Sequence, residues 1–400
     1  MNALVSASAR FAACDGVLWA ENGSLGYALW ARYLDVYDEI SLVVRAVPRS
    51  APPPGWVRVT GPGVRGVAVP DFHSARGLMA EHRRIQRAVH AVLDTVGAVH
   101  LRLPCFLGGY IWRSLERGRP YGVEVVGDPY DVFGAGSVRH PLRPFLRWWS
   151  PRELRRQCAE ATGALYVTAT ALQARYPCRQ LSIAASDVML PDWIFARHAR
   201  PARAGRDPLT VIMVGSLSQL YKAPDVLVDA VGQCVRAGLA MRLLVVGEGR
   251  NRAALEARAD RAGLTGAACF LGALPSLRDV VEQLDRADLF VLPSRVDGLP
   301  RALIEAMARG LPCIGSRVGG IPELLPPEDL VPPGDPAALA GKLREVATDP
   351  ERLARMSARN LEKAKHYRPA VTRAGRVVFY RHVRMKTEKW LHARRRRPCP

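Results

Sequence analysis

Two carboxylates spaced eight residues apart are the side chains best placed to do chemistry in this sequence. Asp297 comes just before Gly298-Leu299-Pro300, and Glu305 follows five residues after that proline. Pro300 suits the first position of a helix, where its missing N–H costs nothing and its φ is already set. The amides after Gly298 would form the positive end of that helix, which can hold a phosphate or an electron-rich sugar.

Taken singly, these acids would be a turn residue and a solvated helix residue. Their spacing around the glycine and proline instead favours one shared binding site. Asp297 could reach a substrate hydroxyl, and Glu305 could accept both hydroxyls of a ribose, as an acid does in dinucleotide-binding folds.

The site needs a strand followed by a helix, and region 209–348 has that pattern throughout. Short apolar runs alternate with helical stretches, which indicates βαβ units on a parallel sheet with ligands at the carboxyl ends of the strands. The expected strands are Leu209–Val214, Met241–Val246, Ala268–Leu271, Asp288–Leu292 and Pro312–Gly315. The expected helices cover 223–236, 250–262, 278–284 and 300–309, and another begins near Ile321.

The first half shows a weaker form of the same pattern. Its expected strands cover 39–44, 96–101, 122–126 and 165–168, and its expected helices cover 78–93 and 153–162. We predict an α/β protein of two Rossmann-like domains facing each other across a cleft. The expected parts are a first domain 1–190, a linker 191–208, a second domain 209–368, a helix about 369–392 that packs back on the first domain, and a basic tail 393–400.

The charge of the chain is uneven. Its 57 basic and 37 acidic side chains give a net charge of +20, yet 201–350 holds 17 basic and 18 acidic residues. The excess lies in 1–200 and 351–400, which suits an anionic membrane or a phosphorylated substrate better than a nucleic acid spread over the second domain. No apolar run approaches the length of a membrane-spanning helix. The eight cysteines form no Cys-x-x-Cys, so we expect no metal, no disulfide framework and a reducing cytosol.

The second half resembles the retaining glycosyltransferases of family 4, which have the GT-B fold. The stretch from Asp297 to Glu305 is similar to their acid-x7-acid motif. The resemblance continues through Val211–Lys222, Leu244–Gly249, Phe270–Gly272, Ala287–Ser294 and Gly319–Glu323. In the first half it rests on the general layout and on pieces such as Gly127–Asp131.

The resemblance implies a role for each matched residue. Asp297 would touch the transferred sugar, Glu305 the ribose, and Lys222, the only lysine before residue 342, the donor diphosphate. As a compact cation, Lys222 could offset the charge developing on the leaving nucleotide. The remaining predicted donor-binding residues are Gly215, Ser216, Gly249, Gly298, Leu299, Pro300 and Glu323. Alternatives stay open for Glu323, as a helix-start acid, and for Gly249, as part of the cleft wall.

The sequence departs from the family pattern at two positions. The first acid is usually Glu, and Asp297 is one methylene shorter, which puts the donor sugar in doubt. Arg often follows the strand-ending glycine, where this chain has Ser216, so one phosphate cation is missing. Arg301 could compensate or could equally be a surface residue.

In this fold the first domain holds the acceptor, and three residues there are candidates. Gly23 opens a turn before a helix, Arg102 ends a strand, and Asp128 follows another strand. Asp128 could contact an acceptor hydroxyl or be a structural turn acid. Its spacing to Asp131 does not match a metal-binding Asp-x-Asp, and we expect no cofactor.

A segment rich in arginine and aromatic residues follows. Between 144 and 156 it holds Phe145, Trp148 and Trp149 among several arginines. The segment could be aromatic core with a basic rim, a membrane interface serving a lipid-linked acceptor, or, with less support, a surface that stacks on nucleic acid.

We therefore predict a cytoplasmic glycosyltransferase, with a second hypothesis placing it at the inner face of the membrane. It would transfer a sugar with retention from a nucleotide-diphosphate sugar to a hydroxyl of a glycan, glycolipid or small metabolite. Alternatives are a nucleotide-sugar 2-epimerase of the same fold and a basic binding protein without activity.

Overall fold

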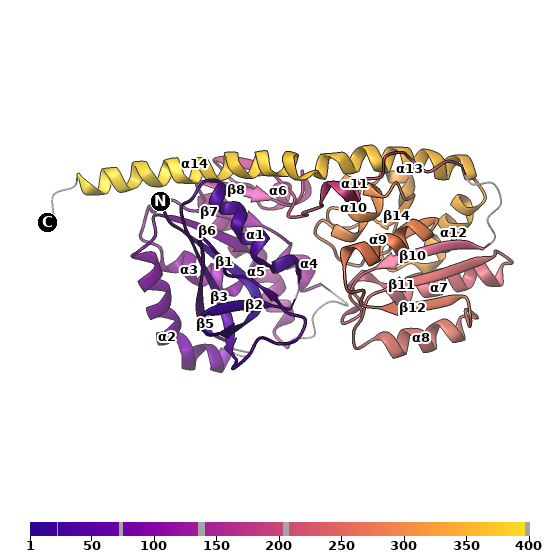
Figure 1. The fold of residues 1–400 in the computed structure, drawn as a ribbon, viewed down its shortest axis with the longest axis horizontal. Helices are drawn as coiled ribbons and strands as arrows, with labels where there is room; N and C mark the ends of the chain where they lie inside the picture. The colour runs from indigo at the N-terminus through magenta and orange to yellow at the C-terminus, as the bar shows by residue number, and fades with distance from the viewer. Residues whose placement is uncertain (22, 72–74, 135–140, 203–207, 397–400) are drawn as a thin grey trace.

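The computed structural model describes residues 1–21, 23–71, 75–134, 141–202 and 208–396. Two α/β units lie side by side along the long axis of the molecule, each built on its own sheet (Figure 1). This arrangement is the GT-B architecture predicted from the sequence. In the described residues no helix is both long and apolar enough to cross a membrane.

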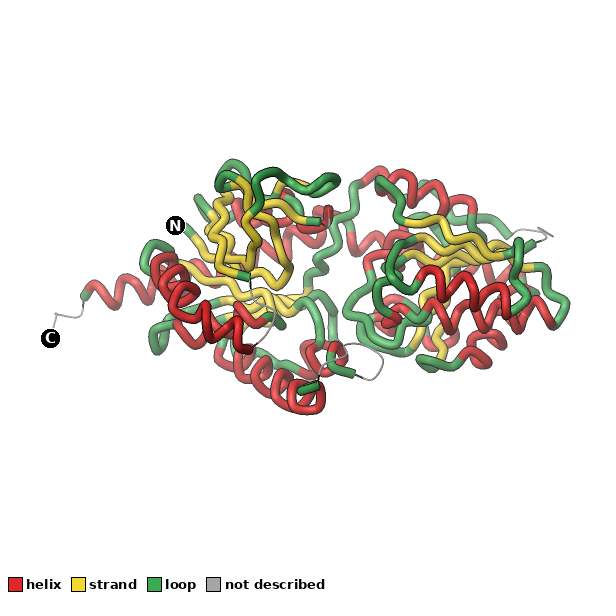
Figure 2. Tube along the Cα trace, turned by 90° about the horizontal axis from the view of Figure 1, so that it is seen from below, coloured by secondary structure: helices red, strands yellow, loops and turns green. Residues whose placement is uncertain are grey.

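The second unit is a six-stranded parallel sheet in the order β12-β11-β10-β13-β14-β15. Its strands are β10 Leu209–Val214, β11 Met241–Val246, β12 Ala268–Gly272, β13 Leu289–Leu292, β14 Cys313–Ser316 and β15 Leu330–Val331. Its helices are α7 Pro224–Arg236, α8 Arg252–Arg261, α9 Leu277–Arg286, α10 Arg301–Ala308, α11 Ile321–Leu324, α12 Pro336–Ala347 and α13 Pro350–Ala364. Helices lie on either side of these strands in the view from below (Figure 2).

The predicted elements of this half are confirmed to within about two residues at most ends. The alternation of apolar runs with helical stretches predicted these elements closely because the central strands are buried and apolar, as parallel strands covered on both faces must be. Helix α10 begins at Arg301, one residue later than predicted, so Pro300 precedes the helix instead of opening it. Gly310 ends the helix with a φ of +63°.

The first unit has a nine-stranded mixed sheet with the central order β4-β2-β1-β6-β7-β8-β9, to which β3 and β5 add beside β1. Its strands are β1 Ala3–Cys14, β2 Val17–Ala20, β3 Ile40–Pro48, β4 Val57–Arg58, β5 Val64–Pro70, β6 Ala98–Leu103, β7 Gly122–Val125, β8 Gly163–Tyr166 and β9 Leu181–Ala184. Its helices are α1 Tyr27–Ala31, α2 Ala75–Leu93, α3 Phe106–Ser114, α4 Pro129–Val132, α5 Arg143–Glu160 and α6 Ala171–Arg175.

Two parts of the chain connect these units. Residues 191–202 pack on the second unit, where Ile194 is buried and Arg200 donates to the carbonyl of Leu284 at 2.9 Å. Helix α14, Pro369–Arg395, returns across the first unit along the top of Figure 1. Its Phe379 is fully buried in the first unit's core.

Candidate active site

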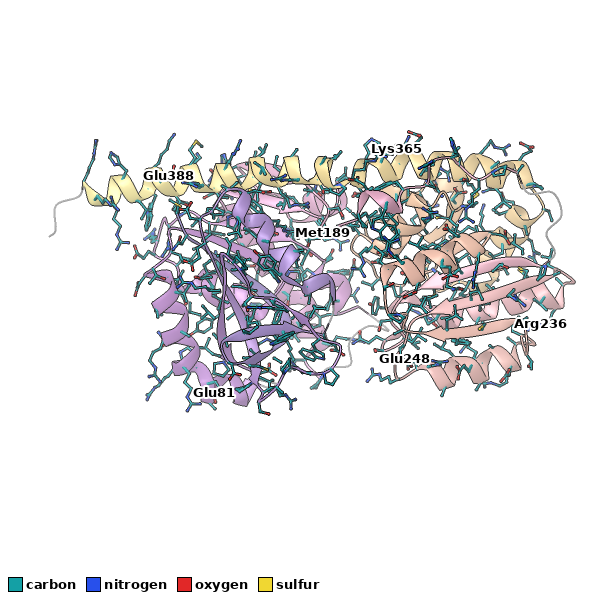
Figure 3. The ribbon with its side chains drawn as sticks, in the orientation of Figure 1. Glu81, Met189, Arg236, Glu248, Lys365 and Glu388 are labelled. Atoms are coloured by element: carbon teal, nitrogen blue, oxygen red, sulfur yellow. The ribbon has the colours of Figure 1, made fainter. Side chains whose placement is uncertain are left out.

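The carboxyl ends of the second sheet point toward the first unit. Glu248 lies two residues after β11, at the side nearest the first unit, whereas Arg236 at the end of α7 lies at the far side (Figure 3). Two adjoining cavities of about 100 and about 230 Å³ occupy the junction. Four residues line both: Asp128 and Asp131 from the first unit, and Asp297 and Gly298 from the second.

The two predicted catalytic side chains contact each other. The Lys222 ammonium donates to a carboxylate oxygen of Asp297 at 2.5 Å, and the Ser294 hydroxyl donates to the same oxygen at 3.0 Å. Both charged side chains are largely buried, being 15% and 8% exposed. A charged pair that is this well shielded from solvent interacts more strongly than one in water. Asp297 lines both cavities, and Lys222 contacts it from outside their lining.

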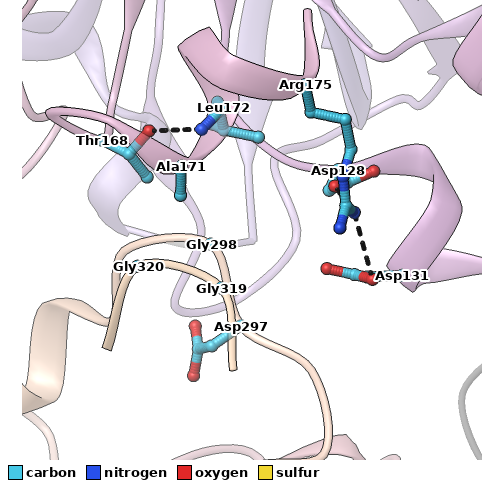
Figure 4. Close-up of a pocket in the computed structure, with 10 residues that line it drawn as sticks. All are labelled: Asp128, Asp131, Thr168, Ala171, Leu172, Arg175, Asp297, Gly298, Gly319 and Gly320. Atoms are coloured by element: carbon cyan, nitrogen blue, oxygen red, sulfur yellow. Dashed lines mark hydrogen bonds and ion pairs between the residues drawn. The ribbon is translucent and has the colours of Figure 1, made fainter. Parts of the chain in front are cut away.

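Glycines allow the loop of Asp297 to lie against its neighbour. The Gly320 N–H donates to the Gly298 carbonyl at 2.6 Å. A Cβ on Gly319, where φ is +53°, would lie 1.6 Å from the Asp297 carbonyl oxygen. Figure 4 shows this pair of loops facing Thr168, Ala171, Leu172 and Arg175 of the first unit. Any side chain at Gly319 would therefore push Asp297 out of place.

The predicted donor-binding residues Gly215, Ser216 and Gly249 also lie where two backbone segments make close contact. The Leu217 N–H donates to the Glu248 carbonyl at 2.9 Å, and a Cβ on Gly249 would lie 2.1 Å from the Ser218 nitrogen. Gly215 lies against the aliphatic part of Lys222, and the Ser216 hydroxyl accepts from the Ser218 N–H at 3.2 Å. These residues form one compact turn beside the lysine.

Glu305 is on α10 and is only 4% exposed. Burial raises the pKa of its carboxyl above the ordinary 4.5, and the nearby Arg301 guanidinium, 3.1 Å away, opposes that rise. Arg301 is paired with this acid and half exposed, so it is not a free cation in this structure. Leu299 packs against the second unit's core.

Glu323 bridges the two units. Its carboxylate accepts from the N–H groups of Ala169, Thr170 and Ala171 at 2.5, 2.9 and 2.7 Å, and from the Thr170 hydroxyl at 3.0 Å. These donors lie at the start of α6 in the first unit. The carboxylate predicted to meet the donor is thus held here by the opposite domain.

Asp128 borders both cavities and caps α4. It accepts from the Tyr130 N–H at 2.9 Å and the Tyr176 hydroxyl at 2.5 Å, and it pairs with Arg175. Burial, followed by the proximity of Asp128, raises the pKa of the Asp131 carboxyl. This side of the junction is therefore acidic and partly desolvated, with Arg175 as its counter-charge.

The other two acceptor-side candidates lie elsewhere. Arg102 is buried in an ionic cluster, donating to Glu124 at 3.0 Å and to Asp187 at 2.7 Å. Gly23 opens a short 3-10 turn and is exposed. Neither residue is among those lining the two cavities. The structure brings Asp128 to the predicted active-site residues but not these two.

Several cavity residues were not singled out from the sequence. Tyr221, Gln219 and Arg175 are examples. Tyr221 and Gln219 precede Lys222, so their place could have been inferred, whereas Arg175 reaches the site only through the packing of α6. Within the described ranges no group of three or more His, Cys, Asp or Glu side chains could hold a metal ion.

The exposure of two aromatic side chains on α5 contradicts the interpretation of this segment as aromatic core with a basic rim. Phe145 and Trp148 are 53% and 54% exposed, so the interpretation as aromatic core is wrong for these two.

Two Rossmann-like units that face each other make up the GT-B fold. Residues 208–349 match the family described as Glycosyl transferases group 1. The chain is 34% identical over 177 residues to the putative colanic acid biosynthesis glycosyltransferase WcaL of Escherichia coli K12, covering 42% of this chain and 43% of WcaL. The second unit is thus similar to the group 1 glycosyltransferases.

Solved structures share the fold over nearly the whole chain. Sucrose-phosphate synthase of Thermosynechococcus elongatus has a TM-score of 0.71 at 18% identity and covers 96% of this chain and 98% of its own. HepE of Anabaena, solved with UDP and glucose, has a TM-score of 0.62 at 16% identity and covers 94% and 98%. At these identities the likeness establishes the architecture.

Proposed function

We propose that the protein transfers a sugar, with retention and without a metal, from a nucleotide-diphosphate sugar held by the second domain to a hydroxyl acceptor held by the first. The Lys222–Asp297 pair carries the proposal, because Asp297 lines both cavities together with Asp128 and Lys222 donates to Asp297. HepE, which shares the fold, was solved with UDP and glucose. A glycan, a glycolipid or a small metabolite would each supply the acceptor hydroxyl.

The proposed reaction needs no protein nucleophile. The acceptor oxygen bonds to the anomeric carbon as the bond from that carbon to the diphosphate breaks, and the departing phosphate oxygen takes the acceptor proton on the same face. Lys222 turns from Asp297 to the diphosphate, and Asp297 accepts from a sugar hydroxyl. Glu305 accepts from the ribose. Positioning and electrostatic stabilisation of the leaving group then lower the barrier.

Thermal unfolding with a panel of nucleoside diphosphates and their sugars tests the donor site. A ligand at 100 times its dissociation constant should stabilise the fold by about 2.7 kcal/mol. Lys222→Ala and Glu305→Ala should weaken that effect, whereas Lys342→Ala, on α12 and paired with Glu345 outside the site, should not. Anomeric NMR of the product, with and without EDTA, then tests retention and metal independence. No stabilisation by any nucleotide would contradict the proposal.

We further propose that the acceptor is lipid-linked and that the protein acts at the inner face of the membrane. Helix α5 lies beside α4, whose Asp131 and Val132 line the larger cavity. At the start of α5, Phe145 and Trp148 are exposed next to arginines, and Arg152 lies 4.5 Å from the Trp148 ring centre. Exposed aromatics with arginines suit an anionic bilayer surface.

Co-sedimentation with phosphatidylcholine vesicles, with and without phosphatidylglycerol, tests this contact. We expect binding only with phosphatidylglycerol, and a loss of about tenfold or more in a Phe145→Ser/Trp148→Ser variant. Met79→Ser is the control, since Met79 is 76% exposed on α2. Equal binding by the double variant, or none by the parent protein, would contradict the membrane contact.

A further inference from the structure

Arg295 contacts the turn that carries Lys222, although it lies two residues before Asp297. Its guanidinium donates two parallel hydrogen bonds to the Asp225 carboxylate at 2.8 and 2.7 Å, and a third to the Leu220 carbonyl at 2.9 Å. Its backbone N–H donates to the Tyr221 carbonyl at 2.7 Å. Arg295 lines neither cavity, so it touches both site segments from behind.

The turn itself has an uncommon backbone. Ala223 directly follows Lys222, is fully buried and has a φ of +55°, a left-handed conformation that residues other than glycine seldom adopt. Such a conformation persists only where the surroundings impose it. Pro224 then opens α7, and Asp225 in the first turn of that helix is held by Arg295. The lysine is thus followed by a segment with little freedom.

The ion pair is well formed. Burial, the largest single effect, would raise the pKa of the Asp225 carboxyl, but the hydrogen bonds and the charge of Arg295, with smaller contributions, together lower it. Two links therefore join the same two segments: Lys222 with Asp297 at the cavity, and Arg295 with Asp225 behind it. A ligand that takes Lys222 from Asp297 would leave the second link in place.

We propose that the Arg295–Asp225 pair is a positioning device, which fixes the turn 220–223 so that Lys222 points into the junction when it leaves Asp297 for the donor diphosphate. Arg295 itself touches no substrate. This inference rests on the proposed function, because it assumes that Lys222 acts on the diphosphate.

Arg295→Lys keeps the charge but cannot reproduce the bidentate contact together with the bond to Leu220. Its matched control is Arg258→Lys, since Arg258 binds Asp229 bidentately at 2.7 and 2.6 Å, one turn along α7 from Asp225. UDP and GDP are titrated into each variant, and the tighter nucleotide is used throughout. Arg295→Lys should weaken its affinity about tenfold, and Arg258→Lys should change it less than twofold.

A double-variant cycle separates positioning from general damage. With Lys222→Ala already present, adding Arg295→Lys should cause no further loss of affinity, because the side chain being positioned is gone. Asp225→Asn should reproduce the Arg295→Lys effect and serves if that variant does not fold.

Each other outcome has a definite meaning. An equal further loss in the Lys222→Ala background would overturn the inference, since Arg295 would then act by itself. Normal affinity in both Arg295→Lys and Asp225→Asn, with Lys222→Ala weakened, would overturn it while leaving the proposed function standing. Normal affinity in Lys222→Ala, or no binding of any nucleoside diphosphate of the panel used for thermal unfolding, would contradict the proposed function as well.

Discussion

At the scale of single residues, the burial of the Glu305 carboxyl in the candidate site reduces the stability of the fold. A buried carboxyl with one half-exposed arginine as partner is poorly compensated for leaving water, which is why its pKa is raised. An apolar or amide side chain of similar size would suit the fold of α10 better. The presence of an acid there is consistent with a binding role that stability alone would not select.

The pH dependence of the stability of Glu305→Gln tests whether the buried carboxyl reduces the stability of the fold. Because the folded-state pKa lies above 4.5, protonated Glu305 favours the folded state; this contribution is fully present below pH 4.5 and is lost as the pH rises through the folded-state value. The Tm of Glu305→Gln minus the Tm of the parent protein should therefore be larger at pH 8 than at pH 4.

The same variant should bind the preferred nucleoside diphosphate about 10- to 100-fold more weakly, because its amide is a poorer acceptor for a ribose diol. Glu256→Gln is the control, since Glu256 is partly exposed on α8 and pairs with Arg252. A variant that lost stability at pH 8 or kept full nucleotide affinity would show that Glu305 is structural.

At the scale of elements, α6 belongs to the first unit but depends on the second. Four donors at its start are satisfied by Glu323, and its Arg175 pairs with Asp128 at the cavity. The contact therefore connects the second unit to the Asp128 side of the cavities through a helix of five residues. So short a helix has little stability of its own, and the carboxylate adds to the cap that the Thr168 hydroxyl provides by accepting from the Leu172 N–H at 3.0 Å.

Hydrogen exchange provides a direct test of this dependence. In Glu323→Ala, the amides of Ala169, Thr170 and Ala171 lose their acceptor, and we expect their exchange to become about tenfold faster or more. Asp335→Ala is the control, because Asp335 caps α12 by accepting from the N–H groups of Ala337 and Ala338 in the second unit. Unchanged exchange at 169–171 would mean that the two units do not share this contact in solution.

Elements differ in how well the sequence predicts them. Strand β10 and helix α7 follow clear periods, and both were predicted closely. Strand β1 has twelve residues and was missed, because its alanines and serines give a weak strand signal although most of it is buried. Helix α5 was expected from residue 153 but begins at Arg143, since it contains Pro151, which ordinarily ends a helix.

The candidate site was predicted unevenly for a related reason. Asp297, Lys222 and Asp128 border or meet the junction because each follows a strand at its carboxyl end, a rule that needs only the sequence. Arg102 also lies near the carboxyl end of a strand, yet its side chain binds Glu124 and Asp187 inside the first unit. Which way a strand-end side chain points depends on the partners that the fold brings to it, and these come from distant parts of the chain.

At the scale of the whole molecule, α14 is the element that makes the two units one protein. It leaves the second unit after α13 and packs on the first sheet, where Gly122 and Gly163 leave room for the Phe379 ring. A Cβ on Gly122 would lie 2.8 Å from that ring. The first unit's core is therefore completed by residues almost 200 positions after its last strand, β9.

Phe379→Ala should consequently destabilise the first unit, although the residue follows the second unit in the sequence. Emptying this fully buried site should cost about 3–5 kcal/mol. Val378→Ala is the control on the same helix, since Val378 is 53% exposed and should cost less than about 0.5 kcal/mol.

The distribution of tryptophans makes the effect separable, because none of the eight lies between 194 and 389. Tryptophan fluorescence thus follows mainly the first unit and α14, apart from Trp193 in the segment that packs on the second unit, whereas circular dichroism follows the whole chain. In urea, Phe379→Ala should lower the fluorescence midpoint and leave a later dichroism transition for the second unit. If both signals shifted together, the two units would unfold as one, and α14 would be part of a single cooperative structure.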